Sequence, residues 1–175
     1  MKIYKNVLPN DLYLECMEEL ESNSERSCWR SSSFTWNENI RKCVSGECLV
    51  SPVSESLTEK IEFEFKKYFP EYSRFEVSFY CWMSGGGICF HDDHTHDKKC
   101  GATIYLNESW NPEWGGVFLW YENQEDESVG KISGLSPKFN NLIINDTFQK
   151  HMVTFIIKLL NFGDNPEIYP TDSSS

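Results

Sequence analysis

The chain has 175 residues, of which 25% are charged and 15% aromatic, and its formal net charge is −11. That length suits one domain able to bury a sizeable core without disulfide staples. The acidic balance disfavours a nucleic-acid substrate, because phosphate binding would oppose the overall field. Seven cysteines cannot all pair, which favours free thiols and a cytoplasmic protein. The first residues lack the apolar core of a signal peptide, and no apolar run approaches the ~20 residues that span a membrane.

Two amphipathic helices are expected in the first 70 residues. Apolar side chains recur at every fourth position after Pro9 and again after Pro52: Leu12, Cys16 and Leu20, then Leu57, Ile61 and Phe65. This spacing places them on one face of a helix. Residues 22–51 between the helices have no clear period, so we expect a loop with short strands there.

The period changes to two from Arg74 onward, where apolar and polar residues alternate as they do in a half-buried strand. Further short runs bounded by turn residues are expected to be strands: Ile88–Asp93, Ala102–Leu106, Gly116–Tyr121, Asn141–Asn145 and His151–Leu159. Helices followed by many short strands predict an α+β fold whose antiparallel strands form a sandwich or barrel.

All four histidines of the chain stand out: His91, His94, His96 and His151. His91 and Asp93 project from the same face of an extended strand, so an imidazole and a carboxylate are able to point at one ion. A third ligand such as His151 would complete a facial triad of two histidines and one carboxylate, with positions left for a bidentate co-substrate and O2.

Two alternatives remain open for this cluster. Residues 90–97 would also suit a polar turn bonded to backbone groups and water. His94 and His96, with Asp97 or His151, would instead suit a zinc or cupin-type site.

The stretch from Tyr80 to His151 resembles the prolyl 4-hydroxylase-like branch of the 2-oxoglutarate/Fe(II) oxygenases. The resemblance rests on motifs that occur in that family's order: Tyr80, Gly85–Gly87, His91-x-Asp93, Ile104–Asn107, Trp110–Gly116, Phe139–Asn140 and His151. It implies a double-stranded β-helix, a jelly-roll and cupin-like barrel, with N-terminal supporting helices. The implied organisation is one domain at 1–170, with a helical prelude at 1–70, a barrel core at 74–160 and a disordered tail at 171–175.

The same resemblance implies an activity. Fe(II) held by His91, Asp93 and His151 would work with 2-oxoglutarate, and with ascorbate as a candidate reductant, to hydroxylate a peptidyl residue of the prolyl type. Succinate and CO2 would be released, and the partner would be a peptide or protein substrate. Tyr80 and Tyr105 would lie near the co-substrate, where a phenol donates a hydrogen bond to its distal carboxylate.

The C-terminal part departs from the family pattern. No Arg follows His151, although the family places a basic residue on the next strand to pair with that distal carboxylate. Lys158 is the remaining candidate, but strand alternation puts it on the face opposite His151 unless a bulge intervenes. This departure keeps open a weakly active or inactive metal-binding module on the same fold.

Overall fold

In the computed structural model, residues 1–71, 75–93 and 100–157 are described. The helical elements are α1 (Asn10–Glu25), the 3-10 turn η1 (Ser32–Phe34), α2 (Glu38–Cys43), α3 (Glu55–Phe65), the 3-10 turn η2 (Pro112–Trp114) and α4 (Gln124–Val129). The strands are β1 (Lys2–Lys5), β2 (Arg30–Ser31), β3 (Val44–Ser45), β4 (Cys48–Pro52), β5 (Ser78–Trp82), β6 (Gly87–His91), β7 (Gly101–Ile104), β8 (Phe118–Trp120), β9 (Ser133–Leu135), β10 (Asn141–Asn145) and β11 (His151–Val153).

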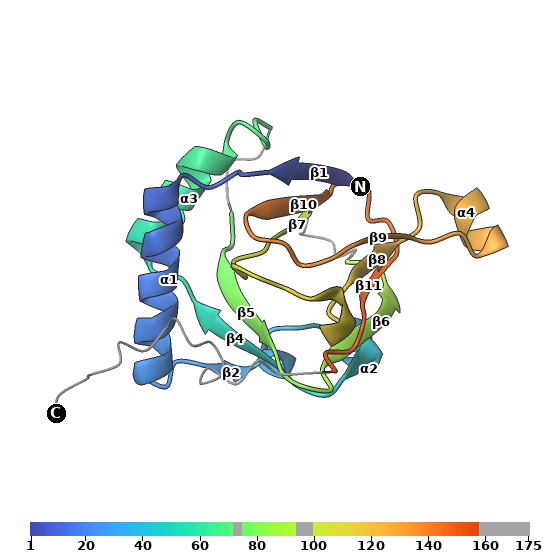
Figure 1. Ribbon diagram of the computed structural model, residues 1–175, viewed down its shortest axis with the longest axis horizontal. Helices are drawn as coiled ribbons and strands as arrows, with labels where there is room; N and C mark the ends of the chain where they lie inside the picture. The colour runs from blue at the N-terminus through green and yellow to red at the C-terminus, as the bar shows by residue number, and fades with distance from the viewer. Residues whose placement is uncertain (72–74, 94–99, 158–175) are drawn as a thin grey trace, which may run out of the picture.

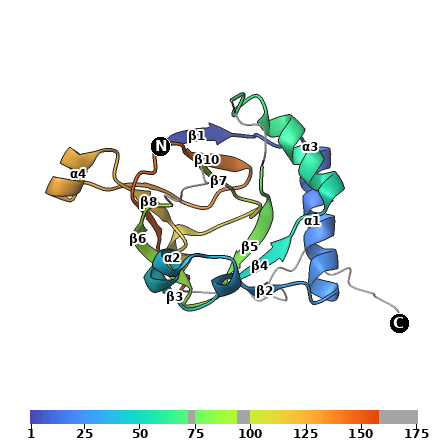
Figure 2. The ribbon, with the colours of Figure 1, turned by 180° about the vertical axis from the view of Figure 1, so that it is seen from behind.

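The strands form three antiparallel sheets, in the orders β1-β10-β7, β2-β4-β5 and β3-β6-β11-β8-β9. Helices α1 and α3 lie on one side of the molecule and the five-stranded sheet on the other, while α4 projects outward (Figures 1 and 2). The ladders among the described strands do not close into a complete barrel. The arrangement agrees with the predicted α+β class.

The two predicted helices are confirmed and share one core. Their apolar faces are buried, and they pack on the outer face of the sheet that contains Leu142 and Ile144. Helix α3 begins after Ser54, whose hydroxyl accepts a hydrogen bond from the Leu57 amide and so satisfies one free N–H of the first turn. Apolar burial on one stripe of each helix therefore fixes these helices against the sheet.

Strand β10 is the central strand of its sheet, and its bounds are those predicted. All five of its residues are buried because both faces are covered. Leu142 and Ile144 face the helices, whereas Ile143 packs with Phe118 and Trp120 between the sheets. A strand covered on both faces needs a continuous apolar run rather than alternation.

Several predicted boundaries were wrong. The strand expected from Arg74 begins at Ser78, which pairs with Pro52 where β4 ends, and Arg74 itself lies outside the described residues. The segment 22–51 contains more than a loop with strands, because α1 continues to Glu25 and α2 forms there. The short strands expected between the helices form as β2, β3 and β4, whereas β1, before the first helix, was not predicted.

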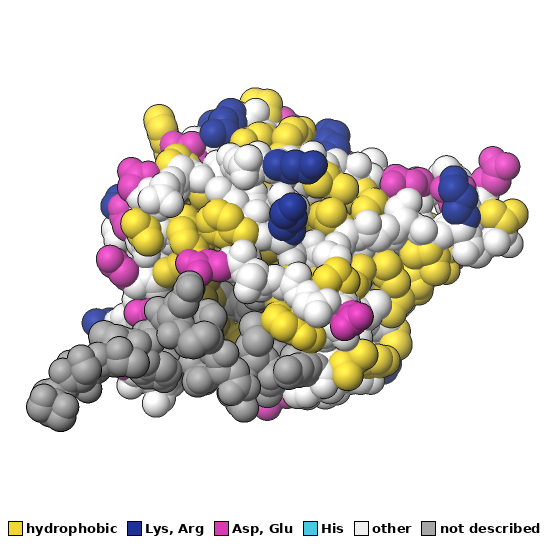
Figure 3. Space-filling model, viewed as in Figure 1, with side chains coloured by type: hydrophobic (Ala, Val, Ile, Leu, Met, Phe, Trp, Pro, Cys, Tyr) yellow, Lys and Arg dark blue, Asp and Glu magenta, His cyan; other side chains and the backbone are white. Residues whose placement is uncertain are grey.

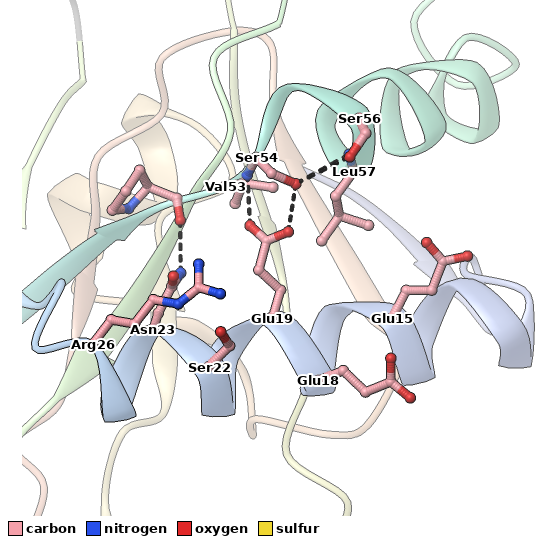
Figure 4. A pocket seen from close by; sticks show the side chains of 11 residues that line it. Glu15, Glu18, Glu19, Ser22, Asn23, Arg26, Val53, Ser54, Ser56 and Leu57 are labelled. Atoms are coloured by element: carbon pink, nitrogen blue, oxygen red, sulfur yellow. Dashed lines mark hydrogen bonds between the residues drawn. The ribbon is translucent and has the colours of Figure 1, made fainter.

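Charged side chains are spread over the face seen in Figure 3, with acidic groups on the projecting α4 and beside α1. A groove of about 540 Å³ lies between α1 and the start of α3 (Figure 4). Its central carboxylate, Glu19, accepts hydrogen bonds from the amide and hydroxyl of Ser54 and so tethers the two helices. Within the described part of the chain, no helix is long and apolar enough to cross a membrane.

Candidate metal centre

Strands β6 and β11 bring two histidines from distant parts of the sequence together. His91 is the last residue of β6 and His151 the first of β11, and their α carbons are direct partners in the antiparallel ladder. Asp93 follows β6 by two residues and turns its carboxylate back toward both rings. One ligand atom from each of the three residues lies within 4.8 Å of the others.

The carboxylate of Asp93 lies between the two imidazoles. Its Oδ1 is 3.5 Å from Nε2 of His91, and its Oδ2 is 3.6 Å from Nε2 of His151. The ring centroids of the two histidines are 4.4 Å apart. The three side chains are only 9%, 17% and 7% exposed for His91, Asp93 and His151 respectively, so their lone pairs converge in a largely dehydrated space.

Both imidazoles are oriented through their other nitrogen. Nδ1 of His91 is 2.9 Å from the carbonyl oxygen of Cys89, and Nδ1 of His151 is 3.0 Å from that of Gln149. A carbonyl oxygen only accepts, so each bond assigns the proton to Nδ1 and the lone pair to Nε2, the nitrogen that faces Asp93. Bonds of this kind fix the tautomer and ring orientation of metal-binding histidines.

An apolar wall lies behind His151. The Phe118 ring stacks on its imidazole at 5.0 Å between centroids and 16° between planes. Phe118, Trp120 and Ile143 form a buried cluster against which Tyr105 packs. Burial raises the pKa of the Tyr105 phenol well above its usual range, so the hydroxyl stays protonated and is a donor.

The second predicted co-substrate tyrosine, Tyr80, is more exposed than Tyr105. Tyr80, in β5, is 48% exposed and its ring stacks on Trp36 at 5.9 Å. Burial, and more weakly the charge of Asp93, raise its pKa, while hydrogen bonds with Trp36 and Thr35 act in the opposite direction. The influence of Asp93 shows that this phenol lies within electrostatic range of the cluster.

The three residues of the predicted triad are all described, and they lie close together. His94, His96 and Asp97, the basis of the alternative zinc site, lie outside the described residues, as does Lys158. The strand predicted at His151–Leu159 is assigned only to Val153, yet backbone bonding goes on: Gly116 N donates to Thr154 O, and Ile156 N to Gly86 O. Residues 154–157 are thus hydrogen-bonded to segments on both sides.

Residues 77–162 match the family model of the 2OG-Fe(II) oxygenase superfamily. This part of the chain is similar to that superfamily. No curated protein was found to match the chain.

Two solved structures share the fold of this protein. A prolyl-4-hydroxylase from Pseudomonas putida is 17% identical with a TM-score of 0.66, over 90% of this chain and 86% of that one. A prolyl hydroxylase from Trichoplax adhaerens, in complex with a hypoxia inducible factor oxygen degradation domain peptide fragment, is 19% identical with a TM-score of 0.61, over 89% and 77%. The predicted jelly-roll fold and the resemblance to the prolyl 4-hydroxylase-like branch are thereby confirmed.

The donor set of the cluster fits the metal that the matched superfamily uses. Two imidazole nitrogens and one carboxylate oxygen are the ligands of the facial triad that holds non-haem Fe(II) and leaves sites open. The matched residues begin near β5 and include all three members of the cluster. Strands β1, β3 and β4 precede the match but pair with β10, β6 and β5 inside it.

Proposed function

We propose that the protein is a 2-oxoglutarate- and Fe(II)-dependent dioxygenase that hydroxylates a peptidyl residue of the prolyl type. The observation that carries the proposal is the convergence of His91, Asp93 and His151 within 4.8 Å, with both Nε2 atoms directed at one carboxylate. The family match supports the cofactor pair Fe(II) and 2-oxoglutarate. When bound, they supply the oxidising chemistry, in which one oxygen atom of O2 enters the substrate and 2-oxoglutarate leaves as succinate and CO2.

The protein's own residues hold and shield this chemistry. His91, Asp93 and His151 would hold the metal. Phe118 and Ile143 exclude water from the space beside His151, which strengthens each polar interaction inside. The protonated phenol of Tyr105 packs against this wall and would donate a hydrogen bond to the distal carboxylate of 2-oxoglutarate.

The proposed peptide substrate would reach the metal past Tyr80. Its half-exposed ring, stacked on Trp36, lies within electrostatic range of Asp93. Trp82 lies beside them, with its ring 5.7 Å from that of Trp36. An aromatic surface of this kind suits the apolar ring of a prolyl residue. The two prolyl hydroxylases of the same fold support this substrate class.

An anaerobic titration with Fe(II) and 2-oxoglutarate tests the proposal. A keto acid chelated to Fe(II) produces a visible metal-to-ligand charge-transfer band, which we expect in the unaltered protein and not in Asp93→Ala. The matched control is Asp92→Ala, which removes the neighbouring exposed carboxylate and should keep the band. Failure of iron-loaded protein to give the band would overturn the proposed cofactor use.

Turnover is tested separately. The protein is incubated with Fe(II), 2-oxoglutarate, ascorbate and proline-containing peptides, and succinate and peptide mass are measured. Hydroxylated peptide with an equal amount of succinate supports the substrate class. The charge-transfer band without any peptide oxidation would favour a weakly active or inactive module, the alternative raised by the lack of an Arg after His151.

A further inference from the structure

The five-residue segment from Asn145 to Gln149 is closed by one buried side chain. Asn145 ends β10 and is 4% exposed. Its Oδ1 accepts a hydrogen bond of 2.9 Å from the amide of Gln149, and its Nδ2 donates one of 3.0 Å to the carbonyl oxygen of the same residue. Because one side chain satisfies both backbone groups of Gln149, it holds that peptide as a neighbouring strand would.

The carbonyl held in this way is the one that orients His151. Nδ1 of His151 is 3.0 Å from Gln149 O, and 3.3 Å from Nδ2 of Asn145. The shorter contact ends on an atom that only accepts, so it assigns the proton to Nδ1. Nε2, on the far side of the ring, is then the deprotonated atom that faces Asp93.

The two histidines of the cluster differ in what supports their acceptors. His91 donates to Cys89 O, which belongs to strand β6 and is ordered by the sheet. His151 donates to Gln149 O, which precedes β11 and lies in the segment between strands. A carbonyl outside the ladder needs another source of order, and the amide of Asn145 provides it.

We propose that Asn145 is a positioning residue for the third metal ligand: it fixes the Gln149 carbonyl, which in turn fixes the orientation and Nδ1-protonated tautomer of His151. The proposal rests on the proposed function, because it assigns His151 to the metal. Groups that orient a ligand in this way typically change metal affinity about 10- to 100-fold when they are removed.

Metal affinity with a matched control provides the first test. Asn145→Ala is compared with Asn140→Gly, since Asn140 is another buried asparagine that bonds both backbone groups of a single residue, Leu8. Glycine is used there because Asn140 has φ 56°. We expect Fe(II) or Co(II) to bind Asn145→Ala about 10- to 100-fold more weakly and Asn140→Gly unchanged. Equal affinity in both variants would overturn the proposal.

A conservative variant separates positioning from simple loss of structure. In Asn145→Asp, one carboxylate oxygen still accepts from the Gln149 amide. The other oxygen is unable to donate to Gln149 O, but it replaces that carbonyl as the acceptor for Nδ1 of His151, which lies 3.3 Å from the Nδ2 atom that this oxygen replaces. Carboxylate-supported histidines are good metal ligands. We therefore expect Asn145→Asp to recover most of the metal affinity that Asn145→Ala loses. The same loss in both variants would count against the proposal.

The metal-free protein offers a readout that does not depend on the proposed function. Proton–nitrogen correlation NMR of the imidazoles reports which ring nitrogen is protonated, and the chain has only four histidines. Asn145→Ala should move the tautomer population of His151 away from the Nδ1–H form and leave His91 unchanged. An unchanged His151 spectrum would refute the positioning role. If the spectrum shifts as expected but no variant binds metal, the proposed function fails and the positioning role stands.

Discussion

His91 and His151 lie directly opposite each other across the β6–β11 ladder. Each ring donates from Nδ1 to the carbonyl oxygen of the residue two positions before it in the chain. The separation of their Nε2 atoms is therefore set by interstrand geometry rather than by a flexible loop. Side chains on such directly paired residues approach within reach of a common ion. Sites built on strands hold their ligands more accurately than sites built on loops.

Removal of Asp93 or of His151 should abolish tight metal binding. Asp93→Ala and His151→Ala each leave two ligands, too few to hold Fe(II) in a facial triad. Calorimetric titration with Fe(II) under anaerobic conditions measures this loss. His96→Ala is the control that discriminates the alternative zinc site: its affinity should be unchanged, and a large loss would favour that alternative.

Metal binding should raise the thermal stability of the unaltered protein. A ligand that binds only the folded state stabilises it by about 2.7 kcal/mol when its free concentration is 100 times the dissociation constant. The unfolding temperature should therefore rise with Fe(II) under anaerobic conditions and fall again with a chelator. Asp93→Ala should show no such rise, and an equal rise in that variant would place the stabilising metal elsewhere.

Tyr105→Phe should weaken 2-oxoglutarate binding and leave Fe(II) affinity unchanged. The variant removes one donor to a charged acceptor, an interaction of about 1.5–3 kcal/mol, or roughly 10- to 100-fold in affinity. The titration of the charge-transfer band against 2-oxoglutarate measures it. Tyr121→Phe is the control, because the Tyr121 ring stacks on Phe90 rather than on the apolar wall behind His151. Equal affinity in Tyr105→Phe and Tyr121→Phe would remove Tyr105 from the co-substrate site.

Two glycines with positive φ should respond differently to alanine. Gly130, at φ 70° and ψ 24°, is in the left-handed helical region, where a side chain costs about 1–2 kcal/mol. Gly115, at φ 80° and ψ −149°, is in a region that is essentially restricted to glycine. A Cβ at Gly115 would lie 1.8 Å from the carbonyl oxygen of Phe155, whereas one at Gly130 meets nothing within 4 Å. Urea unfolding should therefore show a much larger loss for Gly115→Ala than for Gly130→Ala. Similar losses would mean that the segment after His151 is able to move away from Gly115.

The two most buried thiols should resist alkylation in the folded protein. Burial raises the pKa of Cys16 to about 11 and that of Cys48 to about 12. Because the thiolate is the reactive form, both should stay unmodified at pH 8 and react only after denaturation. Mass spectrometry after iodoacetamide treatment locates the modified residues. Rapid alkylation of Cys48 in native protein would show that β4 opens readily.

The sequence was sufficient to predict those helices and strands whose apolar residues follow the pattern of burial. The bounds of β10 follow from a continuous apolar run, and the helices α1 and α3 from apolar residues at every fourth position. Helices α2 and α4 were not predicted, because they are short and polar. Each begins at an asparagine cap, Asn37 or Asn123. Such helices are stabilised by capping and context rather than by an apolar stripe.

The three residues of the candidate site could also be predicted from the sequence, but the residue proposed to position one of them could not. His91 and Asp93 were found because two residues separated by one share a strand face, and His151 because it is the single histidine outside the cluster. Asn145 carries no comparable signal. Its role arises from the closure of residues 145–149, where one amide meets both backbone groups of Gln149, and no spacing rule predicts that contact.

The pairing of β1 with β10 has a consequence for the order of assembly. Lys2 lies opposite Ile144, so β1 is synthesised long before β10, the strand with which it pairs. Contacts between such distant segments slow folding, because loop-closure entropy is lost before they form. The pairing of β10, the strand that ends in Asn145, thus forms late. We therefore expect the ability to bind metal to appear among the last steps of folding.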